Sequence, residues 1–314
     1  MLRRNPAGRM PLNCVEALPR FTGRRHALAE FSGMNDRSIS NPGASDFEEL
    51  ARSIREHRAI LFVGAGASMS VGLPSWRELI EHMAKELGVE ADAFSGSGGH
   101  HTLAEFYRIK QGSIGPLRSW MDRRWKVSED EVRKSKIHDL IVDLEFPIIY
   151  TTNYDRNLEV AFEIHDKPFV KVANARDIAK AVDGVTQIVK FHGDFDDDQS
   201  LVIAETDYFD RLSFDTPLDI KFRADALGKT VLFIGYSMSD MNIRLLLHGL
   251  WKTWRQSGYE SNRPKSFVFM TRSDPVQQAV LGQWGLSILS GENDDPEEGL
   301  TAFLAKLKDA VSQE

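Results

Sequence analysis

The chain has 314 residues, of which 42% are hydrophobic and 27% are charged, as in soluble globular proteins. Its formal net charge of −7 argues against nucleic-acid binding through an overall positive field, and no apolar run approaches the roughly 20 residues that cross a bilayer. The single cysteine, Cys14, excludes an internal disulfide and a cysteine zinc site within this chain, and fits a reducing cytoplasm.

The first 33 residues differ in composition from the rest. They contain six arginines and two acidic residues, and they lack the continuous apolar core of a secretory signal. A transit peptide, a disordered tail and an upstream extension of a protein that truly starts at Met34 are all compatible with this pattern. We expect residues 1–44 to be a disordered or wrongly assigned extension, and residues 45–314 to form the folded domain.

The first strong pattern is an apolar run at residues 59–63 with the length and branching of a buried strand. An amphipathic helix is expected before it, at residues 46–57, with Ser45 as its N-cap. After it come two glycines separated by one alanine, and then a helical pattern from about Ser75. A strand, a glycine turn and a helix let backbone N–H groups face a phosphate, because residues without a bulky Cβ permit a close approach. By itself, this pattern fits an ordinary strand-to-helix turn equally well.

The next 50 or so residues carry no strand signal and predict a helical insertion at about residues 90–144. A flexible glycine-rich and serine-rich loop is expected at residues 91–101. Helices are expected at residues 102–110, 115–125 and 128–144.

Strand and helix patterns alternate through the second half of the chain. Strands are expected at residues 146–150, 169–172, 186–191, 201–203, 230–235, 266–270 and 286–289. Helices are expected after residue 155 and at residues 205–212, 218–227, 240–252, 275–281 and 296–311. The core strands are continuous apolar runs, which favours a parallel sheet covered on both faces. The sequence therefore predicts a Rossmann-like, doubly wound α/β fold with a mainly parallel sheet.

Polar clusters follow three of the predicted core strands at their carboxyl ends. They are Thr-Thr-Asn-Tyr-Asp at residues 151–155, His-Gly-Asp at residues 192–194 and Gly-Tyr-Ser-Met-Ser-Asp at residues 235–240. The ligand crevice of an open α/β sheet lies outside the carboxyl ends of its strands. We therefore expect these three clusters and the glycine turn to form one ligand site.

The order of these motifs resembles the sirtuin superfamily over about residues 46–290. Sirtuins carry a Gly-Ala-Gly turn with a downstream Gly-x-Pro, a Thr-x-Asn-x-Asp strand end, a catalytic His-Gly and a later Gly-x-Ser. The corresponding stretches here are Gly-Ala-Gly-Ala-Ser at 64–68, Gly-Leu-Pro-Ser-Trp-Arg at 72–77, Thr-Thr-Asn-Tyr-Asp at 151–155, Phe-His-Gly at 191–193 and Gly-Tyr-Ser at 235–237.

Departures from the family pattern indicate the subfamily. Deacetylating sirtuins carry a four-cysteine zinc module between the His-Gly and Gly-x-Ser motifs, whereas residues 194–229 are few and contain no cysteine. The segment after Gly-Tyr-Ser is not the apolar stretch that deacetylases use to pair with an acyl-lysine peptide. The variant resembles the sirtuin-like domains of bacterial antiphage systems, which occur in Thoeris-type effectors and beside short Argonautes and HerA-type ATPases. That resemblance implies that the chain consumes NAD+ by glycohydrolysis, without zinc.

The resemblance also implies that Asn153 and His192 are catalytic. Asn153 would orient the attacking water or the ribose hydroxyls, because its amide donates and accepts hydrogen bonds without adding charge. His192 would act as the general base, since its side chain has a pKa near neutrality. The alternatives are a strand-end turn residue for Asn153 and a buried histidine bonded to backbone for His192.

The residues expected to bind NAD+ lie in the four motifs and in the segment after the glycine turn: Gly64, Ala65, Gly66, Ser68, Pro74, Trp76, Thr152, Asp155, Gly235 and Ser237. Thr152 replaces the family's glutamine, and Asp155 would hold the asparagine loop or bind the nicotinamide amide. Trp76 would cover the nicotinamide side or belong to the core. Asp240 is expected to be a helix N-cap, and no metal site is expected, including at the His100-His101 pair.

We therefore expect a cytoplasmic NAD+ glycohydrolase that depletes NAD+ in bacterial antiphage abortive infection. The chain leaves no room for a sensor domain after about Leu289, so a homo-oligomer or a partner such as a HerA-type ATPase or a short Argonaute is expected to trigger it. Direct nucleic-acid binding and membrane association are not expected. The alternatives are an NAD-dependent protein deacylase or ADP-ribosyltransferase, and a nucleotide-binding scaffold without catalysis.

Overall fold

A computed structural model describes residues 42–73, 76–94, 99–238, 240–272, 274–291 and 293–313. All of these belong to one compact unit, residues 41–314. The predictions for residues 1–41 and for Pro74 lie outside the described residues.

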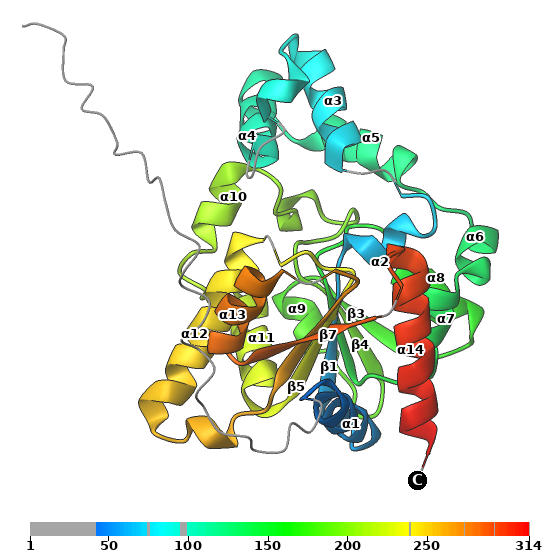
Figure 1. Cartoon of the computed structure of the whole chain (residues 1–314). Coiled ribbons are helices and arrows are strands. Elements are labelled where there is room, and N and C mark those ends of the chain that lie inside the picture. The colour runs from blue at the N-terminus through cyan, green and yellow to red at the C-terminus, as the bar shows by residue number, and fades with distance from the viewer. Residues whose placement is uncertain are drawn as a thin grey trace, which may run out of the picture. The chain divides into compact units, whose positions relative to one another are not determined.

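Seven parallel strands form the centre of this unit (Figure 1). Their order across the sheet is β3-β4-β2-β1-β5-β6-β7, and every pairing between them is parallel. In chain order the strands are β1 (Ala59–Val63), β2 (Ile148–Thr151), β3 (Phe169–Val172), β4 (Thr186–Lys190), β5 (Thr230–Ile234), β6 (Ser266–Met270) and β7 (Leu286–Ser290). The prediction of a doubly wound, parallel α/β fold is thus confirmed.

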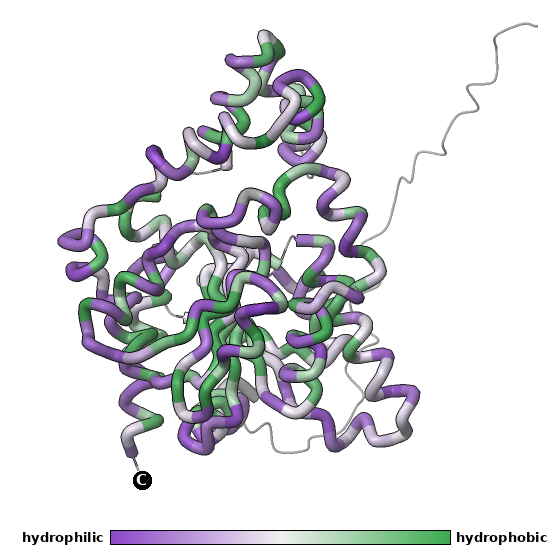
Figure 2. Tube along the Cα trace, turned by 180° about the vertical axis from the view of Figure 1, so that it is seen from behind, coloured by the Kyte–Doolittle hydropathy of each residue, from purple (hydrophilic) through white to green (hydrophobic). Residues whose placement is uncertain are grey.

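The central strands are apolar throughout because both faces of the sheet are covered. In β1, Leu61 and Val63 belong to one core cluster, and Ile60 and Phe62 belong to another. Figure 2 shows the hydrophobic residues gathered in the strands at the centre, while polar residues dominate the outer helices. Side chains alternate across a strand, so a buried parallel strand needs an apolar residue at every position.

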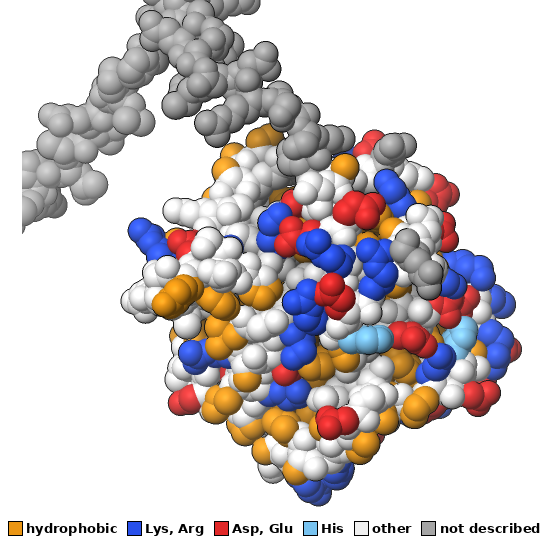
Figure 3. Space-filling view, turned by 90° about the horizontal axis from the view of Figure 1, so that it is seen from below, with side chains coloured by type: hydrophobic (Ala, Val, Ile, Leu, Met, Phe, Trp, Pro, Cys, Tyr) orange, Lys and Arg blue, Asp and Glu red, His pale blue; other side chains and the backbone are white. Residues whose placement is uncertain are grey.

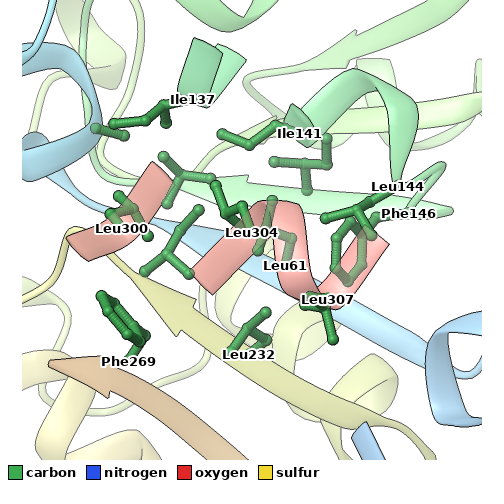
Figure 4. Packing of buried hydrophobic residues seen from close by; sticks show 14 of the residues in the cluster. Leu61, Ile137, Ile141, Leu144, Phe146, Leu232, Phe269, Leu300, Leu304 and Leu307 are labelled. Atoms are coloured by element: carbon green, nitrogen blue, oxygen red, sulfur yellow. The ribbon is translucent and has the colours of Figure 1, made fainter. Parts of the chain in front are cut away.

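One face of the sheet is covered by α1 (Pro42–Arg55), α6 (Glu129–Lys134), α7 (Lys136–Asp143), α8 (Asn157–Ile164) and α14 (Pro296–Ser312). Figure 4 shows Leu304 of α14 between Leu61 of β1 and Ile141 of α7. Each such leucine contributes about 1.5–3 kcal/mol when it is fully buried. The other face is covered by α11 (Pro217–Gly228), α12 (Met241–Ser257) and α13 (Pro275–Gln283).

A helical insertion at residues 76–125 forms a third core of its own. It overlaps only part of the insertion expected at about residues 90–144, because α6 and α7 pack on the sheet instead. It contains α3 (Trp76–Leu87), η1 (Ala91–Phe94), α4 (Gly99–Gln111) and α5 (Gly115–Arg124). These helices pack against Tyr154, Phe195 and Ile203, which lie in the segments that follow β2 and β4. The insertion therefore covers the carboxyl edge of the sheet. Between this edge and α4 lies α10 (Glu205–Asp210), which contacts α4.

Four local predictions were wrong. Of the loop expected at residues 91–101, residues 91–94 form η1 and residues 99–101 belong to α4. Ser45 lies inside α1, which begins at Pro42, and so cannot cap it. The helix expected at residues 128–144 is two helices, because Ser135 ends α6 and its side chain caps α7 by accepting from the His138 N–H. Residues 201–203 form no strand; this apolar run is buried instead against the insertion.

Four short elements had no sequence prediction: α2 (Ala65–Met69), α9 (Ala175–Ile178), η2 (Asp198–Ser200) and η3 (Glu260–Asn262). Of these, α2 matters for the site, because it begins directly at the glycine turn. The helical pattern expected from Ser75 is a separate helix, α3.

Basic and acidic side chains are intermixed on the face viewed in Figure 3, and they form no continuous basic area there. None of the described helices combines the length and the apolar character that crossing a bilayer requires. Within the described ranges, no group of three or more histidine, cysteine, aspartate or glutamate residues could hold a metal ion.

Candidate active site

The glycine turn after β1 packs directly on the turn after β5. The N–H of Gly64 donates to the Ile234 carbonyl at 2.9 Å, and the N–H of Gly66 donates to the Gly235 carbonyl at 2.9 Å. A Cβ on Gly64 would lie 2.4 Å from the Gly235 oxygen, and Gly235 itself has a φ of +59°. The glycines are therefore required by the contact between the two turns, and both glycine amides are engaged within the protein.

Asn153 is fixed to this glycine turn from the end of β2. Its Nδ2 donates to the Gly64 carbonyl and to the Ser68 Oγ, each at 3.1 Å. Its backbone N–H donates to the Thr151 hydroxyl, which in turn donates to the Val63 carbonyl. With both donors of the amide directed into the turn, Oδ1 is the atom left to accept a hydrogen bond from a water or a hydroxyl.

His192 lies at the end of β4, the strand that pairs with β2. It is 3% exposed, and its Nε2 lies 3.7 Å from Oδ2 of Asp240. Burial lowers the pKa of His192 to about 4; the Asp240 carboxylate opposes this shift, while Arg211 and His101 add to it. The ring is therefore neutral at pH 7 and able to accept a proton.

A row of aromatic rings leads from the insertion to His192. The Tyr208 ring of α10 lies 5.5 Å from His192 and 3.9 Å from His101 of α4. His100 is the next ring in the row. The Trp76 ring lies tilted against His100, with 4.9 Å between the ring centroids, and Trp76 is 38% exposed. Trp76 is thus not a core residue, and His100, His101 and Tyr208 lie between it and His192 in this row. The row covers His192 in the described conformation.

Tyr236 connects the glycine turns with the surroundings of His192. Burial raises the pKa of its hydroxyl well above the ordinary value, and the nearby Asp240 carboxylate acts in the same direction, while Thr152 opposes it. Its ring would contact any side chain at Gly64. Thr152 and Asp240 are thereby brought to one wall of the site.

Asp155 holds its own loop. Its Oδ1 accepts from the Asn157 N–H at 3.0 Å, and its carbonyl accepts from the buried Lys190 ammonium. Lys190 also lies 3.4 Å from Glu159, and both side chains are buried. Of the two roles expected for Asp155, these contacts support holding the asparagine loop.

A pocket of about 390 Å³ opens beside the two turns. Three of the predicted residues line it, Gly66, Gly235 and Ser237. Its other residues come from the end of β6, from α13 and from α14: Phe269, Met270, Thr271, Arg272, Gln277, Pro296 and Leu300, with Tyr236 between the two groups. Apolar walls with a few polar groups and one cation suit a ligand of the nucleotide type.

Sequence reasoning missed the β6 contribution and the neighbours of His192. Thr271 and Arg272 follow β6 without a recognisable motif, although a strand next to β5 would be expected to contribute at its carboxyl end. Tyr208 and His101 had no signal, because a side chain that approaches from a separate helix leaves no local pattern. Ala65 is exposed at the start of α2, and Ser68 is buried against Asn153.

The chain is similar in sequence to known proteins. Residues 147–289 match the family model described as the SIR2-like domain. The chain is 33% identical over 205 residues to a protein named NAD(+) hydrolase ThsA from Enterococcus faecium, a match that covers 64% of this chain and 41% of the relative. It is 27% identical over 258 residues to Defense-associated sirtuin 2 from Bacillus subtilis, covering 77% of this chain and 24% of that protein.

The matched stretch thus spans less than half the length of either relative. A solved structure titled as a complex of a Sir2 homologue with NAD covers 84% of this chain and 95% of its own, with 15% identity and a TM-score of 0.46.

Proposed function

We propose that this chain, a member of the sirtuin-like family with a SIR2-like domain at residues 147–289, hydrolyses NAD+ to nicotinamide and ADP-ribose. The observation that carries the proposal is the placement of Asn153 and His192 at the ends of the paired strands β2 and β4, with Asn153 bonded to the glycine turn. That turn borders the pocket, although neither Asn153 nor His192 lines it. The names of the relatives support the choice of substrate.

The reaction breaks the bond between nicotinamide and the ribose C1′. The electron pair of that bond leaves with nicotinamide, and a water oxygen forms the new bond to C1′. The ring carries positive charge in the transition state, as in other glycosidic cleavages. Catalysis therefore requires a held ribose, a positioned water and an acceptor for the proton of that water.

The two candidate residues supply the last two requirements. Oδ1 of Asn153 accepts a hydrogen bond from the water, because both donors of the amide are held by Gly64 and Ser68. His192 is neutral at pH 7, because burial lowers its pKa to about 4, and this neutral ring is the group proposed to accept the proton. Thr152 and Ser237 are the hydroxyl groups proposed to bind the substrate near these residues.

The composition of the segment between His192 and Gly235 supports hydrolysis over peptide deacylation. It contains no cysteine, so the four-cysteine zinc module of deacetylating sirtuins has no ligands there.

We further propose a role in defence by NAD+ depletion, in line with the printed name of the Bacillus subtilis relative. Unchecked cleavage would kill the host, and His192 is covered by Tyr208 and His101. Basal activity is therefore expected to be low, but measurable with the chain alone, until a partner or self-assembly moves these helices. A HerA-type ATPase or a short Argonaute as partner, a homo-oligomer and a cytoplasmic location remain predictions.

The decisive experiment measures nicotinamide release from NAD+ by the wild-type chain, with and without an acetyl-lysine peptide. Hydrolysis without peptide is expected, and it should be lost in Asn153→Ala and in His192→Ala. The surface variant Asn262→Ala serves as the control. Release that depends strictly on the peptide would indicate a deacylase, and NAD+ binding without any release would indicate a scaffold.

A further inference from the structure

The carboxylate of Asp240 has two separate environments at the start of α12. Its Oδ1 caps the helix by accepting from the N–H groups of Asn242 at 2.9 Å and Ile243 at 3.3 Å. Its Oδ2 lies 3.7 Å from Nε2 of His192. The helix thus fixes one oxygen of Asp240 and leaves the other facing the candidate base.

The surroundings of His192 lack any other group that would favour a proton on the ring. Its Nε2 is buried and has no hydrogen-bond partner among the described residues. Arg211 follows α10, and its positive charge disfavours a second positive charge on His192. His101 lies on α4, and it would act in the same direction when protonated. The ring of Tyr208 on α10 lies nearly perpendicular to the His192 ring, at an interplanar angle of 76°. Asp240 is the one described neighbour whose charge acts in the opposite direction.

Further contacts hold the Asp240 carboxylate in place. Tyr236 lies close to it, and Tyr236 is itself packed on Phe62 and Phe233 of the sheet. Arg244, one turn into α12, donates to the Met238 carbonyl at 3.2 Å, and Met238 is a buried residue with a φ of 57°. The loop that presents Asp240 is therefore held at both ends.

We propose that Asp240 is a positioning residue that orients the His192 ring and supplies the negative charge needed when His192 takes a proton from the attacking water. The inference rests on the proposed function. In that step an O–H bond of the water breaks, its proton moves to the imidazole, and the oxygen bonds to C1′ as nicotinamide departs. An imidazolium in a buried site is costly without a nearby opposite charge. Asp240 reduces that cost because its Oδ2 lies 3.7 Å from Nε2 and its Oδ1 is held by the start of α12.

If Asp240 only capped α12, removal of its charge would not affect His192. The variant Asp240→Asn therefore distinguishes the capping role from the proposed role at His192. Asparagine caps helices as well as aspartate does, so α12 remains capped while the charge is removed. The matched control is Asp295→Asn. Asp295 caps α14 through the same two-amide arrangement, with the Glu297 and Glu298 N–H groups, and it is exposed.

The experiment compares the full-length wild type with both variants in nicotinamide release and in an NMR titration of the His192 ring, assigned with His192→Gln. For Asp240→Asn we expect a 10- to 100-fold lower kcat, a KM within twofold of wild type, an acid limb of the pH–rate profile at lower pH and a lower ring pKa. Asp295→Asn should match the wild type in kcat, KM, the pH–rate profile and the ring pKa.

An unchanged kcat together with an unchanged ring pKa in Asp240→Asn would overturn the inference. Asp240→Ser, which also caps, provides a second neutral variant with the same expectations if Asp240→Asn does not fold. A wild-type chain that releases no nicotinamide would refute the proposed function instead. In that case the titration still decides whether Asp240 controls the charge of His192, because it needs no turnover.

Discussion

The side-chain amide of Asn153 donates a hydrogen bond to the hydroxyl of Ser68 at 3.1 Å, although 85 residues separate them in the sequence. This contact joins the end of β2 to the first helix after the glycine turn, and Ser68 is buried where it accepts. The Asn153 amide is thereby held with its oxygen directed away from the turn. Ser68 thus acts on Asn153, beyond the phosphate-binding role that its position in the motif predicts.

Ser68→Ala is expected to lower kcat for NAD+ cleavage about fivefold, because a neutral hydrogen bond contributes about 1 kcal/mol. The amide would keep its bond to Gly64 but could rotate more freely. Steady-state kinetics test this, with Ser70→Ala as control, since Ser70 donates only to the Ala67 carbonyl in the same helix. A kcat equal to that of wild type would show that Gly64 alone positions Asn153.

Arg272→Ala is expected to raise KM for NAD+ about tenfold and to leave kcat nearly unchanged. Arg272 lines the pocket away from Asn153 and His192, so its loss removes binding energy shared by ground state and transition state. Its surface pair with Asp294 contributes little to stability, because both side chains are exposed. Initial-rate kinetics measure both constants, with Arg133→Ala on α6 as control. A tenfold loss in kcat instead would place Arg272 in the chemical step.

Gly235→Ala is expected to lower the melting temperature by at least about 5 °C, since a left-handed residue with a Cβ and a backbone clash costs more than about 2 kcal/mol. The added Cβ would lie 2.6 Å from the Ala67 backbone nitrogen. The control is Gly249→Ala, at a helical position of α12 with nothing within 4 Å, where alanine should stabilise the protein slightly. Thermal unfolding measures the melting temperature of each variant. Equal melting temperatures for Gly235→Ala and wild type would refute the tight contact between the two turns.

The free energy of unfolding is expected to fall as the pH falls from 6.5 towards 4. Burial lowers the pKa of both His192 and His100 to about 4, so the unfolded chain takes up protons in this window before the native protein does. Each buried histidine contributes up to about 1.4 kcal/mol per pH unit within it. Urea unfolding at pH 7, 6 and 5 measures the slope, which should be smaller in His192→Gln. An identical slope in that variant would contradict the neutral state of His192.

Lys190→Met is expected to destabilise the protein by about 3–5 kcal/mol, because it leaves the buried Glu159 carboxylate without its cation. Burial raises the pKa of Glu159, and Lys190 is the main group that counteracts this. The double variant Lys190→Met/Glu159→Leu should recover most of the loss in urea unfolding. If the single variant were as stable as wild type, the pair would not be an interacting one.

Much of the fold was predictable from the sequence, because the patterns that indicate strands and helices are local. A buried parallel strand is an apolar run whatever its neighbours are, so seven of the eight expected strands were recognisable from composition alone. The exception, residues 201–203, is apolar because the helical insertion covers it, and an apolar run does not reveal which element will bury it. Ser45 and the break at Ser135 were misjudged for a similar reason, since several residues near each position were able to cap a helix.

The site residues also differ in whether a local sequence pattern could identify them. Asn153, His192 and the glycines were identifiable because each follows directly on a strand, and such strand-end motifs have an order along the chain. Asp240 was identifiable only as a helix cap, because its second environment depends on β4 and β5 bringing two distant segments within 3.7 Å.

By itself, the sequence determined a parallel α/β domain, the four strand-end motifs and the absence of cysteine ligands for zinc. Only the tertiary structure decided that β4, β2, β1 and β5 lie side by side, which places all four motifs at one edge of the sheet. It also decided that Tyr208 and His101 cover His192 and that Asp240 faces it. The physical reason is that strand order and helix docking are set by long-range packing, whereas strand formation and capping are set by residues a few positions apart.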